Sequence, residues 1–285
     1  MADVVGQVDI RGENIERAVK GFALQEFRLK QVLLQQTSSN WTETYYREAA
    51  AELSGAGVWT IKGVSRLANF PYVEPNWTKV QGRHIKHAAE GVVSVEDKLT
   101  DAIDVQARTL LRVARAIAKS VDDHIYSELT GASGIGTAAA SDTWDSATIA
   151  NRDPIGDILA GIQNMSENNY DALSNGFLLL SPKDYKNLMV NSKVINNPSF
   201  KTADVVSNGR VGQIAGLNII VTNSVTADEA MIIIGSRAAT YKSAVGLSTA
   251  TIEDKGIKFT IRAWEIGQVQ VTDPLAIYTI TNTQA

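Results

Sequence analysis

Three histidines are the residues of this chain that could ligate a metal or exchange protons near neutral pH. Two of them form the motif His84-Ile-Lys-His87, and the third, His124, lies far along the chain. A separation of three residues puts both rings on one face of a helix but on opposite faces of a strand. No cysteine occurs in the sequence, and no set of acidic ligands accompanies the motif. The pattern predicts no metal site and no cofactor.

The other motifs that could carry chemistry are equally weak. Gly131, Gly134 and Gly136 follow a predicted helix, whereas a phosphate-binding loop lies between a strand and the next helix. The Gly-x-Ser-x-Gly motif of hydrolases does not occur, and acidic pairs such as Asp122-Asp123 stand in ordinary charged surroundings. We therefore expect no catalytic residues. A soluble α+β enzyme would instead need a deep pocket with perturbed titratable groups.

Composition is that of a soluble globular protein able to bury a substantial core. The chain has 285 residues, of which 44% are hydrophobic and 20% charged. With 27 Lys and Arg against 31 Asp and Glu, the net charge of -4 gives no positive field that would draw the whole molecule onto nucleic acid. No apolar run approaches the roughly 20 residues that span a bilayer, and the first residues lack a signal-peptide pattern. We expect a cytoplasmic protein that does not contact membranes.

The clearest element is a helix predicted over residues 100–129, which Thr100 can cap and Gly131 ends. At about 1.5 Å per residue it is roughly 45 Å long and could act as a strut. One face of this helix carries an apolar stripe of Ile103, Ala107, Leu110, Ala114, Ile117, Val121 and Ile125. A second face carries a basic stripe of Arg108, Arg112, Arg115 and Lys119. Such a basic stripe is more often a solvated or salt-bridged face than a nucleic-acid site.

Residues 37–90 combine aromatic residues with glycine and proline breakers, which favours an extended hairpin over a helix. Three of the five tryptophans lie there, at Trp41, Trp59 and Trp77. A two-stranded ribbon has little core of its own, so these rings must be buried against something else. The sequence leaves two candidates for the surface that buries these rings, namely another subunit or the rest of the same chain.

The remaining segments predict a mixture of helices and strands without an internal repeat. Good helix formers predict a helix over 13–36, and the small polar residues of 131–153 predict a loop. Asp153-Pro154 opens a helix that runs to about Asn168, and Ser181-Pro182 follows a strand and opens another helix. The later segments are mainly strands, and Phe259, Ile261 and Ala263 alternate with polar residues. The fold class is therefore α+β.

In this order, the segments resemble the major capsid proteins of tailed bacterial and archaeal viruses, the Hong Kong 97-type capsid fold that encapsulin shells share. The resemblance covers nearly the whole chain. It is strongest where IAGLNIIVTNSV, AMIIIGSRAATY and FTIRAWEIGQVQVTDPLAIYTI follow one another, with Arg262-Ala263-Trp264-Glu265 and Val271-Thr272-Asp273-Pro274 in the last segment.

The resemblance implies a division of the chain. It assigns residues 1–36 to an N-terminal arm with a helix, and residues 37–90 to an extended E-loop hairpin. Residues 91–150 and 223–285 would form a peripheral domain, with the spine helix at 100–129 lying over a β-sheet. Residues 151–222 would form an axial α/β domain around the capsomer centre.

The resemblance also implies a function: a coat protein that assembles with itself, as hexamers and pentamers, into an icosahedral shell around double-stranded DNA. Its place would be the virion capsid, assembled in the host cytoplasm, with portal and scaffolding or decoration proteins as further partners. The expected inter-subunit contacts of the E-loop are Trp59, Arg66, Trp77 and Arg83. The basic stripe of Arg108, Arg112, Arg115 and Lys119 would line the interior or a subunit contact.

Two alternatives stay open beside this interpretation. An encapsulin-like compartment has the same fold but packages protein cargo, and a soluble α+β enzyme would have an unrelated function. Some family members cross-link a loop lysine to an asparagine of a neighbour. Lys62 and Lys79 lie in the corresponding loop, but no motif fixes their partners. Cross-linking is therefore not predicted.

Overall fold

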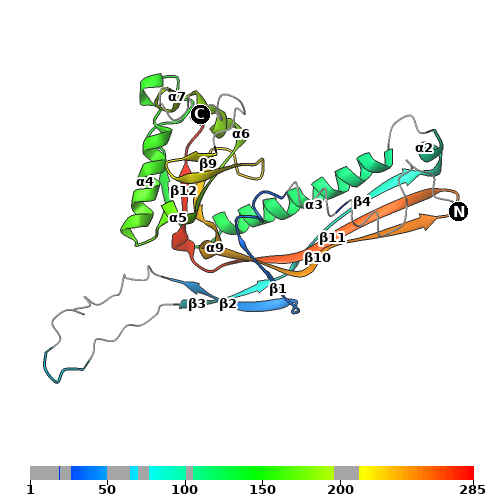
Figure 1. Cartoon of the computed structure of the whole chain (residues 1–285), viewed down its shortest axis with the longest axis horizontal. Coiled ribbons are helices and arrows are strands. Elements are labelled where there is room, and N and C mark those ends of the chain that lie inside the picture. Colours follow the sequence, from blue (N-terminus) through cyan, green and yellow to red (C-terminus); the bar gives the residue numbers. More distant parts are fainter. Residues whose placement is uncertain (1–18, 20–26, 50–64, 70–76, 101–104, 196–211) are drawn as a thin grey trace.

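The computed structural model of this chain describes residue 19 and residues 27–49, 65–69, 77–100, 105–195 and 212–285. Figure 1 shows an elongated molecule in which one sheet runs beneath a long helix and a second sheet stands at one end with shorter helices around it. A narrow hairpin projects from the junction of the two parts. None of the described helices is long and apolar enough to span a membrane.

The long sheet has four strands in the order β1-β10-β11-β4. Their bounds are β1 (Leu34–Thr37), β10 (Ala239–Asp254), β11 (Lys258–Val271) and β4 (Ile85–Ser94). β1 runs parallel to β10, and the other two pairs are antiparallel. Gly256 has a φ of 78° in the turn between β10 and β11, a conformation that glycine adopts without steric cost.

The predicted alternation of β11 is confirmed from Ile261 to Ala263 only, since Thr260 of the expected polar face is also buried and Phe259 is half-buried. Ile261 and Ala263 are buried, while Arg262 between them is exposed and its Nε lies 2.7 Å from Glu90 Oε2. The inward side chains of this strand face the long helix, which contacts both β11 and β4. The strand therefore gives the sheet one apolar face for the helix to cover.

The long helix α3 (Val105–Thr130) is the predicted spine helix. Its apolar stripe is buried at Leu110, Ala114, Ile117, Val121 and Ile125. Gly131 follows its last residue as expected. The backbone of Thr100 ends the preceding helix α2 (Val95–Thr100), and its role as the cap of the long helix stays a prediction. Residues 101–104, which include Ile103, lie outside the described part of the chain.

The second sheet has six strands in the order β5-β12-β9-β6-β8-β7. Their bounds are β5 (Gly136–Ala139), β12 (Ile277–Thr281), β9 (Glu229–Ile234), β6 (Gly176–Leu180), β8 (Leu217–Val221) and β7 (Gln213–Ile214). The helix α4 (Pro154–Glu167) packs on β12 and β9. The remaining short helices are α5 (Ala172–Asn175), α6 (Pro182–Val190), α7 (Ser192–Ile195), α9 (Gly235–Ala238), η1 (Ile149–Asn151) and η3 (Pro274–Ala276).

Both predicted Pro-led helix starts are confirmed. Asp153 caps α4 by accepting a hydrogen bond from the Gly156 N–H at 3.0 Å. Ser181 caps α6 by accepting one from the Asp184 N–H at 3.2 Å. In each case the side-chain oxygen satisfies a backbone donor that the first helical turn leaves unpaired.

Near its end, the chain crosses from the long sheet into the second sheet. β11 belongs to the long sheet and β12 to the second sheet, and the predicted Asp273-Pro274 turn separates them. The buried Asp273 carboxylate accepts hydrogen bonds from Tyr170 Oη and Arg237 Nε, each at 2.9 Å. Breaking these bonds would leave the Asp273 carboxylate buried without a partner, so they stabilise the chain where it crosses from one sheet to the other.

The strand pairing differs from three of the expected boundaries. β9 and β12 lie within the range 223–285 assigned to the peripheral domain, yet they pair in the same sheet as β6 of the axial range. β5, from the expected loop 131–153, joins that sheet by pairing with β12. β4 crosses the boundary placed at residue 90 and runs to Ser94.

The helix predicted over 13–36 is wrong in its last part. Residues 27–33 form turns, and Leu34–Thr37 form strand β1 instead. The backbone of this segment pairs with β10 from Thr240 to Ser243, and these long-range hydrogen bonds override the local helix propensity. Of the earlier residues, only Val19 is described, and it is helical and fully buried.

Candidate functional site

The predicted contact hairpin consists of β2 (Thr42–Glu48) and β3 (Trp77–Arg83), which pair antiparallel. Opposite residues of such a pair point to the same face. The pairs Tyr46 with Lys79 and Glu48 with Trp77 therefore lie on one face, together with Arg83. We call this the outward face, because its side chains are exposed except for the half-buried Glu48, whereas most side chains of the opposite face are half-buried.

The aromatic side chains of the outward face are exposed to solvent in the single chain. Tyr46 and Trp77 are 59% and 58% exposed, and their ring centroids are 6.1 Å apart. The Arg83 guanidinium lies 5.4 Å from the centroid of the Trp41 ring, which is itself half exposed. Exposed aromatic and arginine side chains that group in this way are typical of protein–protein contacts.

The opposite face of the hairpin is anchored on the long sheet by a polar network. The Glu43 carboxylate accepts hydrogen bonds from Lys242 Nζ at 2.7 Å and from Gln270 Nε2 at 3.0 Å, and from the Ser38 hydroxyl. The Lys242 ammonium is the main cause that lowers the pKa of Glu43 to about 2, so the carboxylate stays charged. This network fixes the base of the hairpin on the body of the subunit.

Close backbone approach strengthens that anchor. Gly82 faces Gln268, whose amide nitrogen lies only 1.5 Å from the place a β-carbon would occupy. Arg47 donates a hydrogen bond from Nε to the Val271 carbonyl at 3.2 Å. The hairpin therefore leaves the subunit at a fixed position with one face free.

The basic stripe of the spine helix lies at the surface. Arg108, Arg112, Arg115 and Lys119 are all exposed. Lys119 Nζ lies 2.7 Å from Asp123 Oδ2 on the next turn. The helix thus turns its apolar stripe to the sheet and its cations to solvent, as the sequence pattern predicted.

A buried aspartate joins the arm to the spine helix. Asp122, only 2% exposed, accepts hydrogen bonds from the backbone N–H groups of Arg28 at 2.9 Å, Leu29 at 3.3 Å and Lys30 at 3.4 Å. We call this arrangement the arm clasp. Burial raises the pKa of Asp122, while the backbone N–H groups oppose that rise by binding the charged form. The sequence pattern, in which Asp122 stands beside Asp123 in ordinary charged surroundings, does not predict this clasp.

A second buried carboxylate holds the same arm segment to the sheet. Glu265 is fully buried and forms an ion pair with Lys30 Nζ. Tyr241 donates a hydrogen bond from its hydroxyl to Glu265 Oε1 at 3.0 Å. Burial is the largest cause that raises the pKa of Tyr241, so the phenol stays protonated as a donor.

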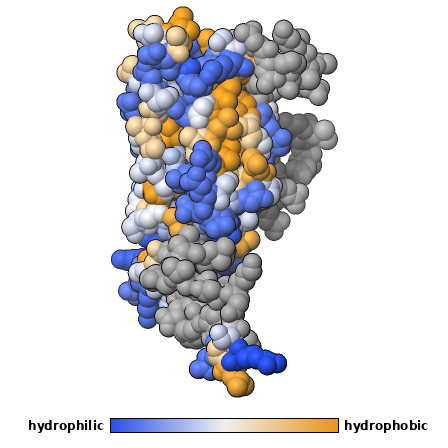
Figure 2. Space-filling model, turned by 90° about the vertical axis from the view of Figure 1, so that its left-hand side faces the viewer, coloured by the Kyte–Doolittle hydropathy of each residue, from blue (hydrophilic) through white to orange (hydrophobic). Residues whose placement is uncertain are grey.

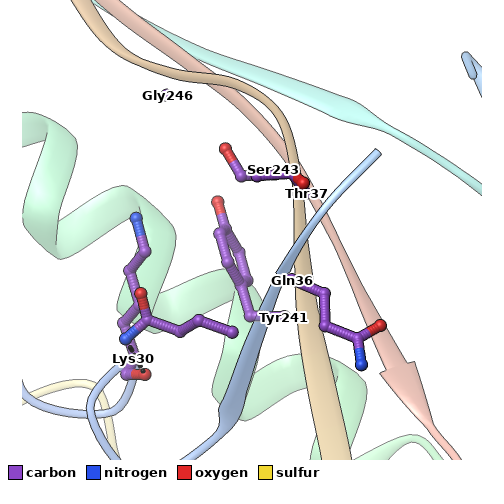
Figure 3. Close-up of a pocket in the computed structure, with 7 residues that line it drawn as sticks. Lys30, Gln36, Thr37, Tyr241, Ser243 and Gly246 are labelled. Carbon is purple, nitrogen blue, oxygen red and sulfur yellow. Dashed lines mark hydrogen bonds between the residues drawn. The ribbon is translucent and has the colours of Figure 1, made fainter. Parts of the chain in front are cut away.

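A pocket of about 650 Å³ opens beside this ion pair, between β1 and β10. Figure 3 shows the Lys30 and Tyr241 side chains extending in the same direction along it. Both of these titratable groups are bound to the Glu265 carboxylate. Among the described residues that line the pocket, neither supplies an activated base or nucleophile, and the others are amides, hydroxyls and a glycine.

The three histidines form no metal centre with the described residues, where no group of three or more His, Cys, Asp and Glu side chains is placed to hold an ion. His87 Nδ1 lies 2.8 Å from Ser120 Oγ, and the His87 and His124 ring centroids are 5.4 Å apart. His84 is buried elsewhere, near Glu43 and Lys242. Burial lowers the pKa of all three rings.

The histidine pair predicts a pH dependence of stability. A ring whose pKa is lowered on folding binds protons more readily when unfolded, so stability is full above about pH 6.5 and falls as the pH drops below that value. We expect urea unfolding of the unassembled chain to show this loss, and His124→Gln to flatten it because one buried ring no longer titrates. A curve as steep in the variant as in the wild type would contradict this role for the His87–His124 pair.

A second exposed apolar surface belongs to the end that carries the six-stranded sheet. Leu159 on α4 and Leu173 on α5 are 49% and 56% exposed, and Ile149 before α4 is 71% exposed. Figure 2 views the molecule from this side and shows hydrophobic surface flanked by hydrophilic atoms. The sequence pattern does not single out these residues, because an isolated apolar residue in or beside a short helix is an ordinary core candidate.

The structure brings together only part of the predicted contact set. Trp77 and Arg83 lie on the outward face, and Arg66 is exposed in a separate described stretch, residues 65–69. Trp59 lies outside the described residues, as does Lys62. Tyr46 and Trp41 are not in the expected contact set, although both are exposed aromatic residues of the same hairpin, and Trp41 is one of the three tryptophans that the sequence pattern singles out there.

Comparisons with solved structures find chains of similar fold at low identity. A virus-like particle from Pyrococcus furiosus matches with a TM-score of 0.66 at 13% identity, over 95% of this chain and 100% of the other. The capsid of cyanophage P-SCSP1u matches with a TM-score of 0.66 at 13% identity, over 100% and 93%. The capsid of a native GTA particle gives 0.62 at 14% identity, over 100% and 96%.

Among curated proteins, none matches the chain. The sequence profile of the family described as phage capsid protein matches residues 85–280, from the start of β4 to one residue before the end of β12. This range contains the spine helix, most of the long sheet and the whole six-stranded sheet. Because the match covers more than half of the sequence, the chain belongs to the phage capsid protein family, and its α+β fold is the Hong Kong 97-type capsid fold of major capsid proteins.

Proposed function

We propose that this chain is the coat protein of a tailed virus and that its copies tile a closed icosahedral shell around double-stranded DNA. The observation that carries the proposal is the family match over residues 85–280. A shell subunit needs flat contacts on several sides rather than one concave site. The anchored hairpin with its exposed aromatic face, and the apolar surface of α4 and α5, supply two such contacts.

Each part has a proposed role in the shell. The outward face, with Trp77, Tyr46 and Arg83, contacts a neighbouring subunit. The end that carries the six-stranded sheet surrounds the capsomer centre and uses Leu159 and Leu173 against the next copy. The chain acts as a structural protein rather than a catalyst. Portal, scaffolding and decoration proteins would complete the particle in the host cytoplasm.

One comparison favours a second candidate function. The Pyrococcus furiosus chain of the same fold is described as a virus-like particle. An encapsulin-like compartment would use the same contacts but enclose protein. The contents of native particles separate the two functions, because a coat protein protects nucleic acid and a compartment co-purifies with an enzyme.

The first experiment is negative-stain electron microscopy of the purified protein, with a nuclease-protection assay on native particles. Closed shells or capsomer rings together with protected DNA are the expected result. Shells that contain protein but no DNA would favour the compartment. A monodisperse monomer or dimer under every assembly condition would overturn the proposal of a coat protein.

A further inference from the structure

A second, smaller groove of about 310 Å³ lies where three distant segments meet. The arm contributes Arg28, the exposed face of the spine helix contributes Arg115 and Lys119, and the chain that leaves β8 contributes its polar residues. Those polar residues are Thr222, Asn223 and Ser224. The groove therefore exists only in the folded chain, and its wall is rich in hydrogen-bond donors.

The arm clasp positions one of the cations. Asp122 lies in the wall of the groove, and its Oδ2 accepts the Arg28 N–H at 2.9 Å. Its other oxygen accepts the N–H groups of Leu29 and Lys30, so the backbone on both sides of the Arg28 side chain is fixed. The backbone of the exposed Arg28 is thus fixed in the wall of the groove that Arg115 also lines.

The charge of the groove is opposite to that of the whole molecule. Among the described residues, its lining contains three cations and one carboxylate, whereas the chain carries a net charge of -4. That carboxylate, Asp122, is already occupied by three backbone N–H groups. Lys119 also pairs with the exposed Asp123, and an exposed ion pair of this kind is weak enough to exchange for a stronger anion.

The donor chemistry fits phosphate. Guanidinium groups present planar pairs of N–H donors that match two phosphate oxygens, and they stay charged at every physiological pH. Hydroxyl and amide side chains such as those of Thr222, Asn223 and Ser224 commonly complete contacts to a nucleic-acid backbone. Contacts of this kind to phosphate oxygens carry no sequence information, so the groove suits DNA of any sequence.

We propose that this groove binds phosphate groups of the enclosed DNA, which places this face of the subunit on the inside of the shell. The inference rests on the proposed function and deepens it, because it identifies the point of contact with the contents. One groove per subunit, repeated over the shell, gives many weak contacts that hold DNA without condensing it.

The test compares two pairs of charge-neutralising substitutions on the full-length, unassembled chain. Fluorescence anisotropy of a labelled 20-base-pair DNA duplex, a length of about two helical turns, gives the affinity across a range of salt concentrations. The groove pair Arg28→Gln and Arg115→Gln should weaken binding about tenfold or more at low salt. It should also make the slope of log affinity against log salt shallower by about 2, because two phosphate contacts are lost.

The matched control is the pair Arg108→Gln and Arg112→Gln, which removes the same amount of charge from the exposed face of the spine helix outside the groove. This control pair should weaken binding of the duplex far less than the groove pair does. An equal loss from both pairs would overturn the proposal in favour of a diffuse electrostatic effect. Arg28→Lys with Arg115→Lys should retain most of the salt slope, which excludes misfolding as the cause. Equal affinity for an acidic peptide of the same charge would also overturn the proposal.

The inward orientation has a separate test, because the chain contains no cysteine. Ser224→Cys introduces a single thiol at the groove. In unassembled subunits both a small maleimide and a bulky polymer-linked maleimide should react with it, whereas in closed shells only the small reagent should. Equal reaction of the bulky reagent in shells would place the groove outside and overturn the proposal. If the wild type forms no shells, the coat-protein proposal fails, and the duplex measurement still reports on the groove.

Discussion

We expect the double substitution Trp77→Ala and Tyr46→Ala to prevent shell assembly at concentrations where the wild type assembles, while the subunit stays folded. Both rings are more than half exposed in the single chain, so their loss should cost folding only about 1 kcal/mol, mainly the cross-strand ring contact. Buried in a contact, each aromatic anchor is worth about 2 kcal/mol, roughly a 30-fold change in the contact's equilibrium constant.

The measurement is the critical concentration for assembly, followed by light scattering and sedimentation. Urea unfolding of the unassembled variant shows whether folding is intact. Val190→Ala, which truncates a residue on α6 that is 58% exposed, controls for a general loss of apolar surface. If the hairpin variant assembles like the wild type, or if the control is equally impaired, the outward face is not the specific contact.

The sequence predicted best the elements whose signals are local. The stripe from Leu110 to Ile125 repeats with the helical period, and each turn of α3 is stabilised by its own neighbours in sequence. The caps at Asp153 and Ser181 act within three residues. Such signals need no knowledge of distant strands, and the structure confirms them.

The sequence could not predict the elements that depend on distant partners. β1 has no strand pattern of its own and exists because β10 offers hydrogen bonds from Thr240 to Ser243. β5 is rich in glycine and alanine, which disfavour strands, yet it pairs with β12. The crossing of the chain between two sheets depends on Asp273, whose partners are about 36 and 103 residues away in sequence.

The site shows the same division between local and distant signals. The aromatic content of residues 37–90 predicted an exposed contact hairpin, and Trp77 and Arg83 lie on its outward face. The arm clasp could not be predicted in this way, because the sequence alone does not show which of the adjacent residues Asp122 and Asp123 is buried. A signal was present, since Asp122 follows Ala118 by four residues and precedes Tyr126 by four, and both of those residues are buried.

Asp122→Ala should lower the free energy of unfolding by about 3 kcal/mol, because it leaves three backbone donors without their acceptor, one of them fully buried. The favourable loss of a buried charge offsets only part of this cost. Urea unfolding of the unassembled chain measures the change. Limited trypsin digestion adds a local measurement, since freeing the arm exposes the peptide bonds that follow Arg28 and Lys30.

Two neighbouring substitutions separate the clasp from a general charge effect. Asp123→Ala removes an exposed carboxylate from the same helical turn and should change the free energy of unfolding by less than about 0.5 kcal/mol. Asp122→Asn keeps one carbonyl oxygen, which can accept from only one side of the clasp, and should lose about half as much as Asp122→Ala. Equal effects at Asp122 and Asp123, or no change in cleavage after Arg28, would show that the arm is held without the clasp, by its apolar contacts and the Lys30–Glu265 ion pair. The arm would then not depend on the clasp to place Arg28 beside the spine helix.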